Sequence, residues 1–278
     1  GAGDVPGVVA ALTTPGERFY EGASGGRGQG HAAAMGQDTV LWLASMTKPV
    51  VGAAAMQLVE QGRIGLDDPA ARIIPELGTF KVLEGWEADG KPRLRDPKTA
   101  ITLRNLLTHS SGFTYDIWNP DMARYAKAMN LPRAGSGRNI ALRIPLLFDP
   151  GARWEYGIGI DWAGKMVEAV SGLRLGEYIG RNLTGPLGMD STAFRITPAM
   201  RARMAKVHQR EEGGKFVVSD FEVPQDPEFE PGGGGLYSTA ADYLKFMRMI
   251  LNGGRGNGNE VLRPETVGLM ARNAMGGL

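Results

Sequence analysis

A serine and a lysine three positions apart, Ser45 and Lys48, have the residue types and the spacing that an activated serine nucleophile needs. The run before them, residues 39–43, is short, apolar and partly β-branched, which is typical of a buried strand. The residues that follow predict a helix over 46–61, in which Pro49 occupies the first turn and no backbone hydrogen bond is lost. The pair therefore stands at the junction between a strand and a helix.

Helical geometry brings the two side chains together. Residues three apart share one face of a helix, so Lys48 can reach the hydroxyl of Ser45. The backbone N–H of Ser45 lies at the positive end of the helix dipole, which favours developing negative charge. The same four residues also fit an N-capping serine followed by an exposed lysine, and the tetrapeptide alone does not choose between these interpretations.

A tyrosine in a second segment can complete this chemistry. Residues 148–157 contain a Pro-Gly turn, and Tyr156 follows it shortly before a helix-like stretch that begins near Asp161. Taken alone, Tyr156 is interpreted as an ordinary core or rim residue. Together with the serine–lysine pair, it becomes a candidate proton acceptor.

A glycine strip forms the third segment. Gly232 to Gly235 lead into a helix expected over 240–251, for which Thr239 and Asp242 form a capping box. The strip lacks the lysine and the hydroxyl residue that complete a phosphate-binding loop, so a phosphate site is disfavoured.

Together these segments resemble the serine β-lactamase and penicillin-binding-protein superfamily, in particular its β-lactamase-like (family VIII) carboxylesterase branch. The resemblance implies an α+β fold, in which an antiparallel sheet is flanked by helices and interrupted by a mostly helical inserted region. The active site would lie in the cleft between them, with the glycine strip beside it. The residues that carry the resemblance are Leu43 to Pro49, Leu103 to Gly112, the Pro150-Gly151 turn with Trp154 and Tyr156, and Gly232 to Asp242.

We therefore expect two interleaved parts. Residues 1–63 and 231–278 would form the α/β part that carries the nucleophile helix. Residues 64–230 would form the mostly helical part that carries Tyr156, built from helices and long loops without convincing strand alternation. Further expected elements are strands at 5–12 and 17–22 and a helix at 264–270.

The resemblance implies a serine hydrolase that cleaves carboxylic esters of short to medium acyl chains through an acyl-enzyme on Ser45. Lys48 and Tyr156 would form the base. Either the cation of Lys48 favours the phenolate of Tyr156, or Lys48 itself accepts the proton when it is neutral. The backbone N–H of Ser45 would supply half of the oxyanion hole. No metal and no cofactor is expected.

Five further residues are candidates for substrate binding. They are Tyr115 and Trp118 as pocket walls, Asp161, and Gly233 and Gly234 of the glycine strip. Ordinary packing explains the two aromatic residues equally well. The aspartate would either orient the tyrosine loop or cap the following helix.

Ile158 is where the chain departs from lactamase and peptidase relatives. Those proteins carry an asparagine at this position, two residues after the tyrosine or serine, and its amide binds the acylamino group of the substrate. An apolar side chain here argues for an apolar acyl group and against strong recognition of lactams or peptides. A β-lactamase or a D-Ala-D-Ala peptidase-like acyl transferase is the close alternative, and a non-catalytic scaffold is the distant one.

Composition limits the other function classes. The 278 residues are 42% hydrophobic, which is enough for a sizeable core. No apolar stretch reaches the length of about 18 residues that a membrane span needs. The net charge is +1 without a long basic run, so a small-molecule ester is a better partner than nucleic acid or an anionic membrane. Cysteine is absent, which excludes disulfides and thiol catalysis.

Two other serine chemistries are disfavoured. The histidines His31, His109 and His208 stand in no context that suggests a Ser-His-Asp triad, and His109 is interpreted as a structural residue that closes a short helix. Gly22 to Gly26 match the G-x-S-x-G nucleophile elbow around Ser24, but no helix follows. A surface turn is expected there instead.

The chain is expected to be part of a longer protein. Members of the family carry a third active-site motif on a strand beyond the glycine-strip helix, and nothing here matches it. A C-terminal fragment of the same protein would supply that strand, complete the sheet and add the second oxyanion donor. A cytoplasmic location is expected, with a signal peptide left open because the N-terminus is also expected to be incomplete.

Overall fold

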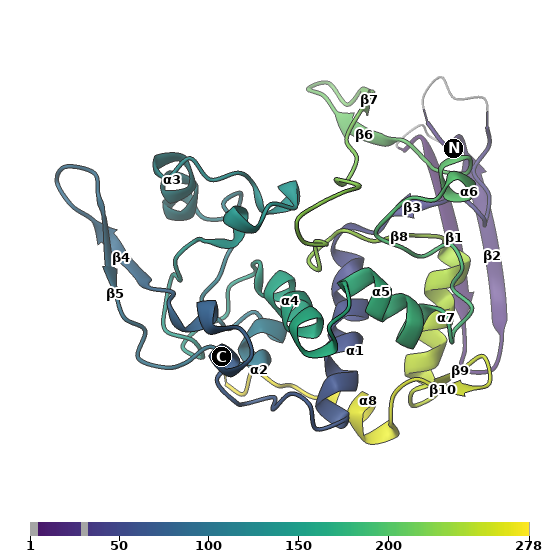
Figure 1. Ribbon diagram of the computed structural model, residues 1–278. Coiled ribbons are helices and arrows are strands. Elements are labelled where there is room, and N and C mark those ends of the chain that lie inside the picture. Colours follow the sequence, from purple (N-terminus) through teal and green to yellow (C-terminus); the bar gives the residue numbers. More distant parts are fainter. Residues whose placement is uncertain (1–4, 29–32, 278) are drawn as a thin grey trace.

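The computed structural model describes residues 5–28 and 33–277 and has the α+β fold that was expected (Figure 1). Its helices are α1 (Thr47–Glu60), α2 (Leu103–Leu107), α3 (Pro120–Ala128), α4 (Gly159–Ser171), α5 (Leu175–Ile179), α6 (Pro198–Arg201), α7 (Ala240–Leu251) and α8 (Pro264–Met270). Its strands are β1 (Gly7–Thr13), β2 (Arg18–Gly25), β3 (Leu41–Trp42), β4 (Val82–Trp86), β5 (Pro92–Arg95), β6 (Val207–Arg210), β7 (Phe216–Ser219), β8 (Tyr237–Ser238), β9 (Arg255–Gly256) and β10 (Asn259–Glu260).

The named strands pair antiparallel, each with one partner: β1 with β2, β3 with β8, β4 with β5, β6 with β7, and β9 with β10. Strands β1 and β2 lie with α7 at one side of the molecule, and the β4–β5 hairpin lies with α3 at the opposite side (Figure 1). The β3–β8 pair positions the site. It places Trp42, three residues before Ser45, opposite Tyr237 at the end of the glycine strip.

Several elements lie where the sequence predicts them. Helices α7 and α8 have the predicted bounds, and β1 and β2 form the expected N-terminal pair. The nucleophile helix α1 begins one residue later and ends one residue earlier than predicted. The strand before it is shorter than predicted, because only the two residues of β3 pair with β8.

Two expectations were wrong. Residues 64–230 contain the hairpins β4–β5 and β6–β7 in addition to helices and loops. In the first hairpin, the alternation of apolar and polar residues is interrupted because the register shifts between Leu83 and Gly85. Gly85 has a φ of +147°, a conformation that suits glycine. Gly22 to Gly25 form the end of β2, so the surface turn expected there is not found.

The capping box predicted for α7 is only half formed. Thr239 accepts a hydrogen bond from the backbone N–H of Asp242, at 3.1 Å. The buried Asp242 carboxylate accepts instead from the backbone N–H of Ser191 at 2.8 Å. This side chain therefore ties α7 to a distant loop, a contact that local sequence rules do not contain.

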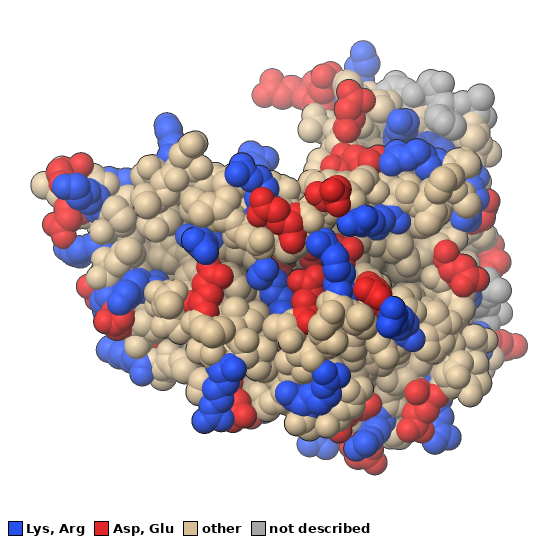
Figure 2. All heavy atoms as spheres, in the orientation of Figure 1, with Lys and Arg blue, Asp and Glu red and all other residues tan. Residues whose placement is uncertain are grey.

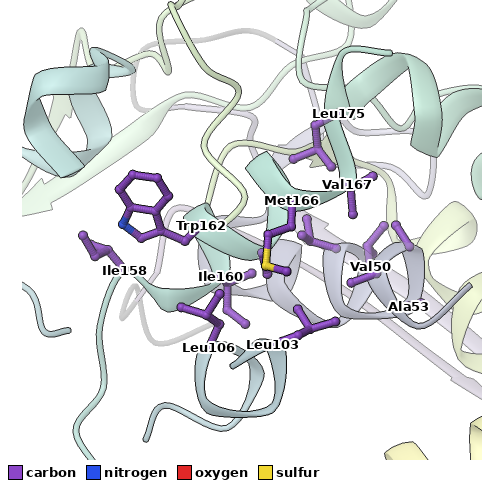
Figure 3. Packing of buried hydrophobic residues seen from close by; sticks show 14 of the residues in the cluster. Val50, Ala53, Leu103, Leu106, Ile158, Ile160, Trp162, Met166, Val167 and Leu175 are labelled. Atoms are coloured by element: carbon purple, nitrogen blue, oxygen red, sulfur yellow. The ribbon is translucent and has the colours of Figure 1, made fainter. Parts of the chain in front are cut away.

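Helix α1 runs through the centre of the core. Residues such as Val50, Ala53 and Leu58, on different sides of the helix, have no exposed surface, which is typical of a helix surrounded by protein. Figure 3 shows α4 packing beside α1, with Met166 of α4 directed into the same cluster. Leu106 of α2 adds to this cluster from a third element. The close packing fixes the helix that carries the candidate nucleophile.

The surface carries both signs of charge. Figure 2 shows basic and acidic side chains interspersed over the visible face, which agrees with the small net charge. Among the residues described, none of the helices has the length and apolar character needed to traverse a bilayer. The two-part division, the cytoplasmic location and the completing C-terminal fragment stay predictions.

Leu106 provides a test of this core. The Leu106→Ala variant is expected to lower the free energy of unfolding by about 2–5 kcal/mol, because it leaves a cavity at a side chain with no exposed surface. Leu94→Ala is the matched control, since Leu94 on β5 is 42% exposed and should cost less than about 1 kcal/mol. Urea unfolding followed by circular dichroism measures both. Equal losses in the two variants would contradict the packing.

Candidate active site

Ser45 lies in a short 3₁₀ turn (Ala44–Met46) between β3 and α1. The preceding residue, Ala44, has a φ of +46°, a left-handed conformation that is strained for a residue with a side chain. The indole N–H of Trp42 donates to the carbonyl oxygen of Gly234 at 2.6 Å and helps to hold this turn in place. The Ser45 side chain is exposed, so its hydroxyl is accessible from solvent.

Three predicted side chains meet at this turn. The Lys48 ammonium donates to Ser45 Oγ at 3.1 Å, and the Tyr156 hydroxyl donates to the same atom at 2.6 Å. Lys48 Nζ also lies 4.6 Å from the centre of the Tyr156 ring. Two groups able to accept the hydroxyl proton are thus within hydrogen-bond reach of one accessible serine.

The glycine strip holds the lysine from its other side. Lys48 Nζ donates to the carbonyl oxygen of Gly233 at 2.7 Å. The same glycine donates its backbone N–H to Oδ1 of Asp161, at 2.9 Å. A Cβ added to Gly233 would lie 2.7 Å from Tyr115 Oη and 2.8 Å from Asp161 Oδ2. Only glycine fits here, because the peptide passes so close to both side chains.

Asp161 is buried in the first turn of α4 and does not cap it, since Ile158 occupies the N-cap position. Its carboxylate holds the glycine strip. The predicted capping role was therefore wrong, and the orientation of the tyrosine loop by Asp161 stays a prediction. Burial raises the pKa of Asp161 to about 6, although the Gly233 N–H and the Lys48 charge oppose the rise. The buried Asp161 carboxylate is thus connected to Lys48 through the Gly233 backbone, which makes one hydrogen bond with each of them.

Of the two predicted aromatic walls, the structure brings Tyr115 to the site. Its ring lies 5.5 Å from that of Tyr156 and 5.5 Å from Lys48 Nζ. Burial, with the Asp161 charge next in importance, raises the pKa of Tyr115, so the phenol stays protonated. Trp118 is 66% exposed and connects to the site through the backbone N–H that it donates to Tyr115. Its contact with substrate stays a prediction.

His109 lies beside Tyr156, whereas the sequence predicted only that it closes a short helix. It has a φ of +58°, and its ring centre lies 4.6 Å from that of Tyr156. Nδ1 accepts the backbone N–H of Gly157 at 3.3 Å, which fixes the loop that carries the tyrosine. Burial, and then the Lys48 charge, lowers the pKa of His109 to about 4. The ring is therefore neutral at physiological pH and cannot act as a cation on the helix dipole.

The chain matches the family model described as Beta-lactamase over residues 1–277. It is 37% identical over 245 residues to "Acyltransferase mokF" of Monascus pilosus, covering 86% of this chain and 58% of that protein. It is 35% identical over 278 residues to "Lovastatin esterase" of Penicillium rubens, covering 97% of this chain and 69% of that protein. The simvastatin synthase LovD of Aspergillus terreus, as its LovD6 mutant, superposes with a TM-score of 0.87 at 35% identity, covering 97% and 67%. The chain thus spans 58% of the length of the Monascus relative.

Gly233 and Gly234 form a matched pair that tests the glycine strip. Gly233→Ala should lower the free energy of unfolding by about 1–3 kcal/mol, because its Cβ has no room between Tyr115 and Asp161. In Gly234→Ala the nearest atom lies 3.6 Å from the added Cβ, so that variant should unfold almost as the parent does. Thermal unfolding measures both, and equal midpoints for the two variants would contradict the described packing.

The raised pKa of Asp161 gives a pH signature. Folding raises this pKa from 3.8 to about 6, so the stability associated with Asp161 is complete below pH 3.8 and is lost as the pH rises through about 6. Asp161→Asn does not titrate there. The stability of the variant minus that of the parent should therefore grow by about 3 kcal/mol over this range and then level off.

Urea unfolding of both proteins at several pH values measures this difference, and other carboxylates cancel in it. A difference that does not change with pH would show that Asp161 titrates normally.

Proposed function

This chain belongs to the beta-lactamase family, and we propose that it cleaves carboxylic esters with short to medium apolar acyl chains through an acyl-enzyme on Ser45. One observation carries the proposal. Ser45 Oγ receives hydrogen bonds from Lys48 and from Tyr156 at 3.1 and 2.6 Å, while its side chain remains accessible. Relatives of this chain include an esterase and an acyltransferase, which carry out chemistry of this kind.

In the first step, Ser45 Oγ attacks the ester carbonyl as its proton passes to the base. The base is the oxygen of Tyr156 or the amine of Lys48, the two groups that contact Ser45 Oγ. The C–O bond to the alcohol then breaks, and the alcohol takes the proton back from the base as it leaves. An ester of Ser45 remains.

In the second step, the base removes a proton from a water molecule, which attacks the Ser45 ester. The bond between the acyl carbon and the Ser45 oxygen breaks, the serine oxygen regains a proton, and the carboxylic acid leaves. The negative charge that develops on the carbonyl oxygen in each step would be stabilised by the backbone N–H of Ser45, in the turn just before α1. We assign the second oxyanion donor to the strand that carries the third motif in other family members.

Transfer of the acyl group to an alcohol is the second candidate. The mechanism is the same until the acyl-enzyme forms, and an alcohol then replaces water as the nucleophile. Relatives with about one third identity, "Acyltransferase mokF" and "Monacolin J acid methylbutanoyltransferase", are described as acyltransferases, which favours this option. Added alcohols that divert acyl product from acid to ester would support it.

The position of Ile158 argues against lactam and peptide substrates. This side chain is 1% exposed and packs into the core, so it offers no polar group to an acylamino substituent. Recognition of lactams or peptides through an amide at this position is therefore lost. A non-catalytic scaffold role is disfavoured because binding alone does not need a lysine and a tyrosine that both hydrogen-bond to one serine hydroxyl.

The proposal predicts how p-nitrophenyl butyrate hydrolysis responds to substitution. Ser45→Ala should abolish turnover, and Tyr156→Phe and Lys48→Met should each lower kcat by about a hundredfold or more, because each removes part of the proton path. Ser24→Ala is the matched control and should keep full activity, since Ser24 lies in β2.

Unchanged folding of each variant is checked by circular dichroism. Full activity in Ser45→Ala would overturn the proposal. Faster turnover of a chromogenic cephalosporin than of the ester would favour the lactamase alternative.

A further inference from the structure

A mostly apolar cavity of ≈430 Å³ adjoins the catalytic lysine. Its volume lies within the range of small-molecule sites. One wall is a face of α1, a second is the end of α2 with the residues after it, and a third is formed by α8 and the residues that follow. The lining includes Lys48, Gly52 and Met56 of α1 and His109 after α2.

The α1 wall leads away from the nucleophile. Lys48, Gly52 and Met56 follow one another at intervals of four residues and form a single row along α1, and Ser45, in the 3₁₀ turn just before the helix, contacts the first of them. From Lys48 to Gly52 this row extends about 6 Å. A chain attached to Ser45 Oγ can therefore follow the row past Lys48 into the cavity.

Several polar side chains that line the cavity already have partners. Lys48 is bound to Ser45 and Gly233, and Arg104 forms two hydrogen bonds with Asp67, at 2.6 and 2.7 Å. His109 accepts from the backbone of the tyrosine loop and carries no charge at neutral pH. Arg272 and Asn273 line the cavity where the chain is exposed. This lining suits a hydrocarbon chain better than an ionic ligand.

Resting on the proposed function, we propose that this cavity is the acyl-chain subsite: a linear apolar acyl chain on Ser45 lies along α1 and fills the space beside Gly52 and Met56. The acyl group is bonded to Ser45 from the end of the first chemical step until the acid leaves in the second, so a cavity reached along the helix next to that serine can hold it during this time. The alcohol and the water must exchange with solvent between the steps, and they need the accessible side of Ser45.

Gly52 makes the assignment testable. A Cβ added to this residue would meet nothing within 4 Å, so a larger side chain can enter the cavity without disturbing the surrounding packing. Gly268 in α8 is the matched control, because a Cβ there also meets nothing within 4 Å but the residue does not line the cavity. Replacing a helix glycine also favours the helix, so both variants should fold.

The experiment compares kcat/KM for p-nitrophenyl acetate, butyrate and octanoate in the parent, Gly52→Ala, Gly52→Leu and Gly268→Leu. Gly52→Leu should lower kcat/KM for octanoate by at least about tenfold relative to acetate, because several methylenes lose their buried contact. Gly52→Ala should give a smaller loss in the same direction. Acetate hydrolysis should stay close to that of the parent, and Gly268→Leu should leave the ratio unchanged.

Two results would overturn the subsite. One is an equal effect of Gly52→Leu on acetate and octanoate. The other is a selective loss of kcat/KM for octyl acetate in Gly52→Leu, because this result would place the alkyl chain of the alcohol in the cavity. Failure of the proposed function looks different, because the parent protein would then hydrolyse none of these esters, and both proposals would fall.

Discussion

The Lys48 ammonium is the group on which the site depends. It contacts the proposed nucleophile Ser45, the carbonyl of Gly233 and the face of the Tyr156 ring, so one cation connects three segments that are far apart in the sequence. A cation that leaves bulk water needs such partners, because desolvation otherwise outweighs its interactions. The carbonyl oxygen and the aromatic face stabilise the charge without neutralising it, and the charge remains able to act on the serine and the tyrosine.

Helix α1, the turn at Ala44 and the glycine strip together hold this cation in place. Helix α1 is buried through most of its length, which leaves the lysine little freedom to move with its backbone. The strained turn at Ala44 presents Ser45 to solvent, and the hydrogen bond from Trp42 to the glycine strip holds that turn. Asp161 completes the arrangement from within the core by binding the Gly233 N–H. Strain and buried charge thus occur together, as is common where a fold carries chemistry.

The sequence predicted the parts of the site that follow local rules. The spacing of Ser45 and Lys48 places them on one helix face, and caps and prolines predict the bounds of α7 and α8. Contacts between distant residues could not be predicted in this way. Asp161 and Gly233 are 72 positions apart, and no local pattern shows that a buried carboxylate binds a glycine peptide. The same limit hid the role of Asp242, and a bulge hid the β4–β5 hairpin.

Covalent labelling tests most directly the claim that Ser45 is an activated nucleophile. The protein is treated with a fluorophosphonate probe, digested, and the modified peptide is identified by tandem mass spectrometry. An activated Ser45 predicts one adduct, on that residue, which is lost in Ser45→Ala and forms much more slowly in Lys48→Met. An adduct on another serine, such as Ser24, or no adduct on the folded protein would contradict the account.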